Sequence, residues 1–216
     1  MFDHAGKGTT VHPLEIILAI AGGYIIGSIP IAYLVTRLIT GRDIRRLGTG
    51  NVGVMNTIRQ AGFPAGMLVF AGEGSKGAAA FGLGRYLAGS DERLILISCL
   101  AALIGVNWSV FLGLSGGRGT TLGAFICALL AWKLVLLGAI VWLAVYLALR
   151  DSFLATRINI LLFPLTAFVA THDLTVAAAA FLAALILLFR HRRDTDDRLQ
   201  LVTSPATIDP RGERRT

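Results

Sequence analysis

The chain has 216 residues, of which 55% are hydrophobic and 15% are charged, and its mean hydropathy is +0.70. A soluble domain usually carries about 25% charged residues. So few polar side chains cannot cover a protein surface in water. The composition excludes a soluble domain and predicts an integral membrane protein.

The charge balance is basic, because 20 Lys and Arg outnumber 13 Asp and Glu. Basic residues beside membrane spans set topology or contact anionic lipid headgroups, so the excess does not indicate a nucleic-acid partner. Both cysteines, Cys99 and Cys127, lie inside apolar runs. No disulfide framework, metal site or cofactor is therefore expected.

Apolar runs predict the membrane spans in chain order. A spanning helix needs about 20 mainly apolar residues. The candidate runs are residues 14–39, 63–87, 94–113, 120–149, 152–170 and 174–189. As one helix, residues 120–149 would measure about 45 Å, too long for one upright span. Two short spans with a turn near Trp132 and Lys133 fit better, which predicts an all-α protein with seven transmembrane helices.

Charge bias predicts the orientation. With seven spans and the N-terminus outside, 15 Lys and Arg fall on the cytoplasmic side and four fall outside: Lys7, Arg85, Arg93 and Lys133. This split follows the positive-inside rule better than a six-span arrangement does. The expected organisation is an external segment at residues 1–13, a membrane domain at residues 14–190 and a cytoplasmic polar tail at residues 191–216.

The richest polar segment, residues 41–59, contains a literal G-x-G-x-x-G pattern. A dinucleotide site is not indicated, because the pattern follows an apolar helix and an Arg cluster rather than a strand. A glycine-rich turn can nevertheless offer backbone N–H groups to an anion. The expected anion ligands here are Gly48, Thr49, Gly50, Asn51, Gly53, Asn56 and Arg59. The arginines of this segment alone could simply obey the charge bias.

A second glycine-rich segment spans residues 113–121. Gly116, Gly117 and Gly119 surround Arg118, so backbone and guanidinium could meet one phosphate. It lacks the Gly-Lys-Ser/Thr ending of a P-loop. A phosphate site and a tight interhelical turn are equally consistent with this segment read alone.

Two other segments carry charges. Glu73 and Lys76 lie three residues apart within an apolar run, which suits either a functional role at membrane depth or an ion pair that orients helices. Residues 190–198 follow the last span. His191 and Asp196 there match an H-x-x-x-x-D spacing, but charged tails produce such spacings by chance, and a basic flank of the last span is the simpler interpretation.

The order and spacing of these segments, from about Gly23 to Leu199, resemble the bacterial acyl-phosphate:glycerol-3-phosphate acyltransferases, a family often called PlsY. The residues that carry the resemblance are Gly27-Ser28-Ile29-Pro30 with Tyr33 and Arg37, Asp43-Ile44-Arg45, Gly48-Thr49-Gly50-Asn51, Phe111-Leu112 with Gly116-Gly117-Arg118-Gly119, residues 152–156, and Arg190-His191-Arg192.

The resemblance implies a seven-span bacterial plasma-membrane protein with an external N-terminus. It also implies transfer of a fatty acyl group from acyl phosphate to the 1-hydroxyl of glycerol 3-phosphate. The products would be phosphate and lysophosphatidic acid for phospholipid synthesis, and the reaction would need no metal. Functional coupling to an acyl-phosphate-forming enzyme is expected.

The resemblance also assigns residues. Thr49 stands where the family has an important Ser, and Arg59 matches its essential Arg. Arg118 replaces a Lys of the glycerol-3-phosphate loop, and His191 matches the His of the third motif. Asp194 stands where the family has Asn. The expected catalytic residues are therefore Thr49, Arg59, His191 and Asp194.

Several departures from the family pattern keep other functions open. Arg for Lys at position 118 changes geometry, and Asp194 places a negative charge near two phosphates. Val106 replaces a His, and Glu73 replaces an Asp. The alternatives are a non-catalytic or substrate-altered paralogue, or a small-solute or lipid transporter, since glycine-rich helices and midplane charges also suit transport.

Overall fold

The computed structural model describes residues 12–88 and 91–203, and at residues 152–153 and 191–203 it describes the backbone alone. Every regular element in these ranges is helical, as the composition predicted. The helices are α1 (Pro13–Ser28), α2 (Ile31–Thr40), α3 (Val54–Ala61), α4 (Phe63–Leu87), α5 (Arg93–Asn107), α6 (Thr120–Leu130), α7 (Trp132–Leu149), α8 (Ser152–Thr171) and α9 (Leu174–Thr203). Two short 3₁₀ turns are η1 (Ile44–Arg46) and η2 (Val110–Leu112).

Two breaks in the helices follow from the sequence. The apolar run at residues 14–39 is two helices rather than one, because Pro30 lacks an N–H and cannot continue α1. The run at residues 120–149 also divides. Ala131 takes an extended conformation between α6 and α7, one residue before the turn predicted at Trp132 and Lys133.

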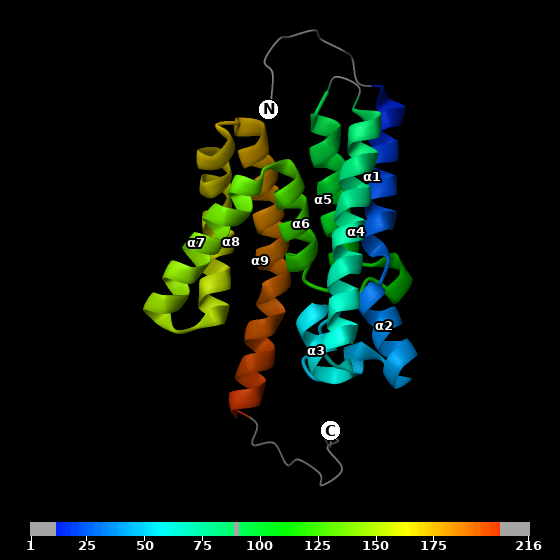
Figure 1. The fold of residues 1–216 in the computed structure, drawn as a ribbon, viewed down its shortest axis with the longest axis vertical. Coiled ribbons are helices and arrows are strands. Elements are labelled where there is room, and N and C mark those ends of the chain that lie inside the picture. Colours follow the sequence, from blue (N-terminus) through cyan, green and yellow to red (C-terminus); the bar gives the residue numbers. More distant parts are fainter. Residues whose placement is uncertain (1–11, 89–90, 204–216) are drawn as a thin grey trace.

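The long helices run alternately up and down the bundle (Figure 1). Helices α1, α4 and α5 stand together on one side, the α7–α8 hairpin lies on the other, and α6 and α9 lie between them. Helices α2 and α3 cover the lower end of the bundle in this view. The connections after α2 and after α5 therefore meet near the same end.

Small residues bring α1 and α5 into direct contact. A Cβ added at Gly23 would collide with the Ser98 carbonyl, and one at Gly27 would collide with the Ala102 backbone. A Cβ at Gly105 would in turn meet the Tyr24 carbonyl. Close backbone approach at small residues is the usual way in which helices associate inside a membrane. This packing places the end of α1 beside the end of α5.

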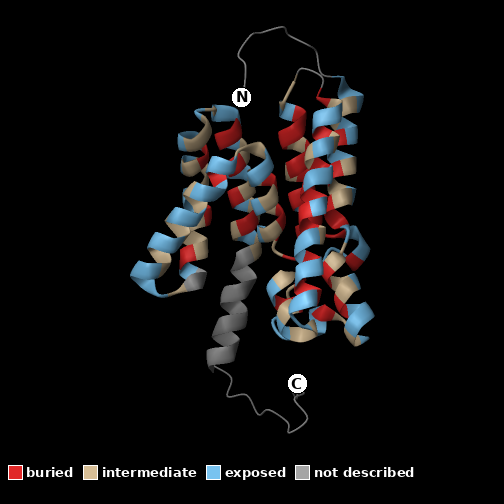
Figure 2. Ribbon diagram, in the orientation of Figure 1, coloured by how far each residue is buried: buried red, intermediate tan, exposed pale blue. Residues whose placement is uncertain are grey.

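Helical length and composition support a multi-pass membrane protein. Within the part of the chain that the structure describes, four segments are long and apolar enough to cross a bilayer: Pro13–Thr40, Arg93–Leu112, Trp132–Leu149 and Leu154–Thr171. Shorter apolar helices cover Thr120–Leu130 and Leu174–Arg190. The segments differ sharply in burial. Of an 18-residue stretch within Arg93–Leu112, 67% of the residues are buried, whereas 6% are buried in Trp132–Leu149. Figure 2 shows the same contrast, with buried residues concentrated on α4 and α5.

Candidate functional site

Asn56, on α3, organises the loop between α2 and α3. Its side chain is 2% exposed. The amide Nδ2 donates to the carbonyl oxygens of Leu47 and Asn51, both at 3.0 Å, and Oδ1 accepts the Thr49 N–H at 3.3 Å. The side chain expected to bind an anion is thus engaged inside the loop, where it fixes the position of Thr49.

Gly48 is required by this arrangement. Its φ is +55°, a left-handed conformation that side chains disfavour, and an added Cβ would lie 2.6 Å from Asn56 Oδ1. Gly53 precedes α3 and is its N-cap residue. Gly48 therefore allows the backbone turn beside Asn56, and Gly53 marks the start of α3.

The glycines of the second loop serve close backbone packing. The N–H groups of Gly116 and Gly117 donate to the carbonyls of Asn107 and Val106, at 3.2 and 2.8 Å. These bonds satisfy carbonyls that the end of α5 would otherwise leave without partners. A Cβ at Gly117 would collide with the carbonyl of Val52, in the first loop. The two loops are thus pressed together, and these two N–H groups are engaged within the protein.

Arg190 attaches α9 to the second loop. Its Nη2 donates to the Gly116 carbonyl at 2.7 Å, and its Nε donates to the Gly117 carbonyl at 3.1 Å. Its guanidinium also lies over the Trp108 ring, 6.0 Å from the centroid. Such a forked donor suits two neighbouring carbonyl acceptors. The last helix is therefore joined to the turn at residues 116–117.

The two loops and Arg190 line an open cleft of about 230 Å³. Its lining is mostly polar and includes three arginines. The lining residues are Arg45, Thr49, Gly50, Asn51, Val52, Ser115, Gly116, Gly117, Arg118 and Arg190. No carboxylate or histidine belongs to this described lining. The cleft therefore presents concentrated positive charge and hydroxyl and amide groups, which suits an anionic ligand.

Asp43 holds Arg45 in place at the edge of the cleft. Arg45 Nη2 lies 2.7 Å from Asp43 Oδ2, and Arg45 Nη1 donates to the Leu112 carbonyl at 3.3 Å. The hydrogen bond and charge of Arg45 lower the pKa of Asp43, so that this carboxylate is ionised at neutral pH. It compensates part of the Arg45 charge; Arg118 and Arg190 are the other two arginines of the cleft lining.

The structure gathers some of the predicted site residues and separates others. Those lining the cleft are Thr49, Gly50, Asn51, Gly116, Gly117 and Arg118. Those outside the lining are Gly48, Gly53, Asn56, Gly119 and Arg59, the last an exposed residue of α3. The side chains of His191 and Asp194 lie outside the described residues, although their backbone continues α9 directly after Arg190.

Sequence reasoning did not select Arg45, Val52, Ser115 or Arg190 for the site. Arg45 lies in the Asp43-Ile44-Arg45 motif, and Arg190 directly precedes His191, so proximity to the motifs was the available signal. The general charge bias explained these arginines equally well. Only the fold brings residues 45, 118 and 190 around one cleft.

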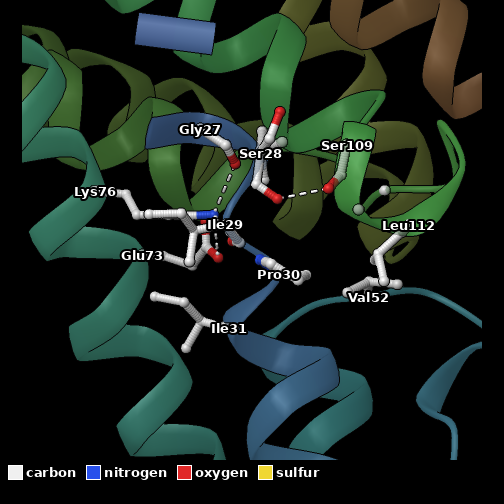
Figure 3. A pocket seen from close by; sticks show the side chains of 13 residues that line it. Gly27, Ser28, Ile29, Pro30, Ile31, Val52, Glu73, Lys76, Ser109 and Leu112 are labelled. Carbon is white, nitrogen blue, oxygen red and sulfur yellow. Dashed lines mark hydrogen bonds and ion pairs between the residues drawn. The ribbon is translucent and has the colours of Figure 1, made fainter. Parts of the chain in front are cut away.

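Glu73 and Lys76 form a buried ion pair behind the cleft. Lys76 Nζ lies 2.9 Å from Glu73 Oε1 and donates to the carbonyls of Gly27 and Ile29, at 3.1 and 2.9 Å. Figure 3 shows both side chains pointing at the break between α1 and α2. An ammonium has three donors, and each has an acceptor here. Of the two interpretations of this pair, the contacts favour helix orientation.

The pair borders a cavity of about 10 Å³, roughly the space that one water molecule needs. Val52, Gly116 and Gly117 line both this cavity and the cleft. The break between α1 and α2 therefore lies directly behind the cleft. Among the described residues, no group of three His, Cys, Asp or Glu side chains gathers as a metal site would require.

The fold and the cleft define a class: a multi-pass helical membrane protein with an arginine-lined cleft at one end of its bundle. A family model described as glycerol-3-phosphate acyltransferase matches residues 17–200. The chain belongs to this family, as its motifs predicted, and it is a membrane acyltransferase.

Curated relatives carry the same description. Glycerol-3-phosphate acyltransferase 2 of Moorella thermoacetica is 43% identical over 136 residues, which cover 62% of this chain and 68% of that protein. The glycerol-3-phosphate acyltransferase of Neisseria meningitidis serogroup C is 33% identical over 185 residues, which cover 84% and 92%.

Solved structures agree with the sequence matches. The crystal structure of PlsY (YgiH), an integral membrane glycerol 3-phosphate acyltransferase, in its glycerol 3-phosphate form matches with a TM-score of 0.73 and 26% identity. The match covers 93% of this chain and 96% of that one. The lysophosphatidic acid form matches with a TM-score of 0.71 and 25% identity, covering 93% and 95%.

Proposed function

We propose that the arginine-lined cleft is where this membrane acyltransferase joins a fatty acyl group from acyl phosphate to the 1-hydroxyl of glycerol 3-phosphate. The observation that carries the proposal is the convergence of Arg45, Arg118 and Arg190 on one polar cleft. Both substrates carry phosphate, so bringing them together requires several cations. Family membership supports glycerol 3-phosphate as the acceptor.

The arginines bind and orient the substrates. Charge-assisted hydrogen bonds from these guanidinium groups to phosphate oxygens fix orientation as well as charge. Asp43 and the carbonyls of the second loop occupy part of the donor sets of Arg45 and Arg190 and thereby fix where those two guanidinium groups lie. Thr49 and Asn51 add neutral groups at the same wall of the cleft. Arg59 lies on α3, one helical turn after Asn56, and we assign it to a second phosphate near this end of the bundle. Positioning of two reactants in this way supplies a large part of the rate.

The chemistry needs no covalent enzyme intermediate. The 1-hydroxyl oxygen of glycerol 3-phosphate attacks the carbonyl carbon of acyl phosphate, the bond from that carbon to the phosphate oxygen breaks, and phosphate leaves. We assign the departing phosphate as the proton acceptor, since the described cleft lining offers arginine, hydroxyl and amide groups and the side chain of His191 lies outside the described residues. The products are lysophosphatidic acid and inorganic phosphate.

The continuation of α9 completes the proposed site. His191 follows Arg190 along the helix and Asp194 lies one turn later, so we assign both to the same end of the bundle. We propose that the charge of Asp194 is tolerated through pairing with a neighbouring Arg or with His191. His191→Ala should then abolish activity, whereas Asp194→Asn should keep or increase it. Gain of activity only in Asp194→Asn would identify a non-catalytic paralogue.

The topology proposed for this function has seven spans in a bacterial plasma membrane, with the N-terminus outside and the cleft facing the cytoplasm. The excess of arginines at the loop after α2 and around α9 supports this orientation. Acyl phosphate would then come from a cytoplasmic enzyme that forms it. Cysteines introduced at Thr9 and Thr203 should label from opposite sides of the membrane, and labelling from one side would refute this topology.

The experiment is acyl transfer by the purified protein in lipid nanodiscs. Labelled glycerol 3-phosphate is offered with acyl phosphate, acyl-coenzyme A or an acylated carrier protein in separate reactions. The proposal expects lysophosphatidic acid and an equal amount of phosphate from acyl phosphate alone. Product only from another donor would reject the proposed donor.

Variants connect that activity to the cleft. Arg118→Ala should lower kcat/KM for glycerol 3-phosphate by at least about tenfold, since a charge-assisted hydrogen bond contributes about 1.5–3 kcal/mol. Arg85→Ala is the matched control, because Arg85 is an exposed residue of α4 outside the cleft lining. Equal activity of the two variants would remove Arg118 from the site.

A further inference from the structure

We infer that Tyr24 and Ser109 are positioning residues for substrate binding: they fix the segment Trp108–Leu112 to the end of α1, and that segment holds Arg45 and Arg190 in the cleft. The inference rests on the proposed function, because it takes these arginines as phosphate ligands. Neither Tyr24 nor Ser109 lines the cleft, so both would act through other residues.

The segment Trp108–Leu112 contacts both arginines, from opposite ends. Its last residue, Leu112, accepts a hydrogen bond from Arg45 Nη1 through its carbonyl, at 3.3 Å. Its first residue, Trp108, presents its ring to the Arg190 guanidinium, 6.0 Å from the centroid. The position of this one segment therefore determines how two cations of the cleft are spaced.

Two hydrogen bonds fix the segment to α1. The Tyr24 hydroxyl donates to the Trp108 carbonyl at 2.8 Å, and the Ser109 hydroxyl donates to the Ser28 carbonyl at 2.5 Å. Tyr24 and Ser28 are four residues apart and so lie on one face of α1. Ser109 is 2% exposed, so water does not replace its bond. The two hydrogen bonds join parts of the chain that are far apart in sequence: the separation is 84 positions for the Tyr24 bond and 81 for the Ser109 bond.

The end of α1 is itself held firmly. Pro30 interrupts the helix, so the last carbonyls of α1 lack the N–H partners that a continuing helix would supply. Lys76, from α4, donates to the carbonyls of Gly27 and Ile29 on either side of Ser28 (Figure 3). The Ser28 carbonyl is left for Ser109. A continuous set of contacts thus runs from the buried ion pair to Arg45.

The experiment compares Tyr24→Phe and Ser109→Ala with Ser98→Ala. Ser98 is a matched control: it is fully buried, and its hydroxyl donates to the Ala80 carbonyl at 2.8 Å, joining α5 to α4 and not to α1. Thermal midpoints and steady-state kinetics with glycerol 3-phosphate are measured for each purified variant, and Arg118→Ala is measured in parallel.

The inference expects similar losses of thermal stability in Ser109→Ala and Ser98→Ala, because each removes one buried hydroxyl. Unlike Ser98→Ala, both Tyr24→Phe and Ser109→Ala should raise the KM for glycerol 3-phosphate, each by about two- to tenfold, the equivalent of one lost hydrogen bond. Their kcat should stay within about twofold of the parent, because chemistry follows normally once substrate is bound.

Two results would overturn the inference, and they differ in meaning. If Arg118→Ala raises KM but Ser109→Ala and Tyr24→Phe match Ser98→Ala in KM, the backing segment does not position the arginines, and the proposed function stands. If Arg118→Ala leaves KM and kcat unchanged, the cleft itself is wrong and both proposals fail.

Discussion

Helices α5 and α7 are similarly apolar, yet one lies at the centre of the protein and the other at its margin. In an 18-residue stretch of Arg93–Leu112, the segment that includes α5, 67% of the residues are buried, whereas in α7 only 6% are buried. The difference lies in residue size. Gly105, Ser98 and Ala102 on α5 allow backbone contact with neighbouring helices, whereas α7 presents large side chains such as Leu136, Ile140 and Leu143.

The comparison teaches where polar groups can be placed in such a bundle. The buried side, formed by α1, α4 and α5, contains the Glu73–Lys76 pair and supports the cleft from behind. The exposed α7–α8 hairpin contains the Trp142–Thr156 hydrogen bond, at 3.0 Å, and none of its described side chains belongs to the cleft lining. Substitutions on the buried side should therefore cost much more than those on the hairpin.

The largest effect is expected at Gly27. Gly27→Leu would force a side chain into the Ala102 backbone, where neither helix can yield without separating. We expect a loss above about 4 kcal/mol, enough to prevent recovery of a folded protein. Gly123→Leu is the control, because a Cβ there meets nothing within 4 Å. Monodispersity on size-exclusion chromatography distinguishes them, and normal behaviour of Gly27→Leu would contradict the packing described.

The next effect is expected at Lys76. Lys76→Met leaves the Glu73 charge buried and removes the Lys76 donor from the carbonyls of Gly27 and Ile29 at the end of α1. Removing one partner of a buried ion pair costs about 3–5 kcal/mol. Lys133→Met, on the exposed first turn of α7, should change stability by less than about 0.5 kcal/mol. Thermal midpoints in detergent measure both, and equal midpoints would contradict the structural role of the pair.

A smaller effect is expected on the hairpin. Trp142→Phe removes the donor to Thr156 Oγ1 and keeps an aromatic ring to stack on Tyr146. The expected loss of stability is about 0.5–1.5 kcal/mol, the usual net contribution of one hydrogen bond. The KM for glycerol 3-phosphate should not change. A change in KM would show that the hairpin contributes to the cleft after all.

The smallest effect concerns the Asp43–Arg45 pair, which lies at the surface, with the Arg45 side chain 37% exposed. Arg45 lowers the pKa of Asp43 in the folded protein, chiefly by hydrogen bonding. The stabilisation is therefore complete above the ordinary Asp pKa of about 3.9 and is lost as the pH falls through the lowered value. The midpoint difference between the parent and Asp43→Asn should stay constant from about pH 8 to 5 and shrink below about pH 4. A difference that changes between pH 8 and 5 would require another titrating group.

Most helices could be predicted from the sequence, because runs of apolar residues leave few alternatives to a membrane helix. The turn between α6 and α7 followed from length alone. The break at Pro30 was missed, although proline in a long run was a visible signal. The short helix α3 was not foreseen, because its polar and apolar residues alternate too briefly for a membrane pattern.

The site was harder to predict than the fold. The glycine-rich motifs lie in the two loops that line the cleft, but the roles of Asn56 and Gly117 depend on which acceptors face them after folding. Arg190 contacts Gly117 and Gly116, which lie 73 and 74 positions earlier in the sequence. No local pattern could predict such a contact. The choice between a structural and a functional Lys76 likewise depended on carbonyls from α1.

The most direct test of the cleft is the affinity of the purified protein for glycerol 3-phosphate, measured by isothermal titration calorimetry. Arg45→Ala, Arg118→Ala and Arg190→Ala should each weaken binding by about tenfold or more, whereas Arg85→Ala should bind as the parent does. Unchanged affinity in the three cleft variants would contradict the assignment of this cleft as the substrate site.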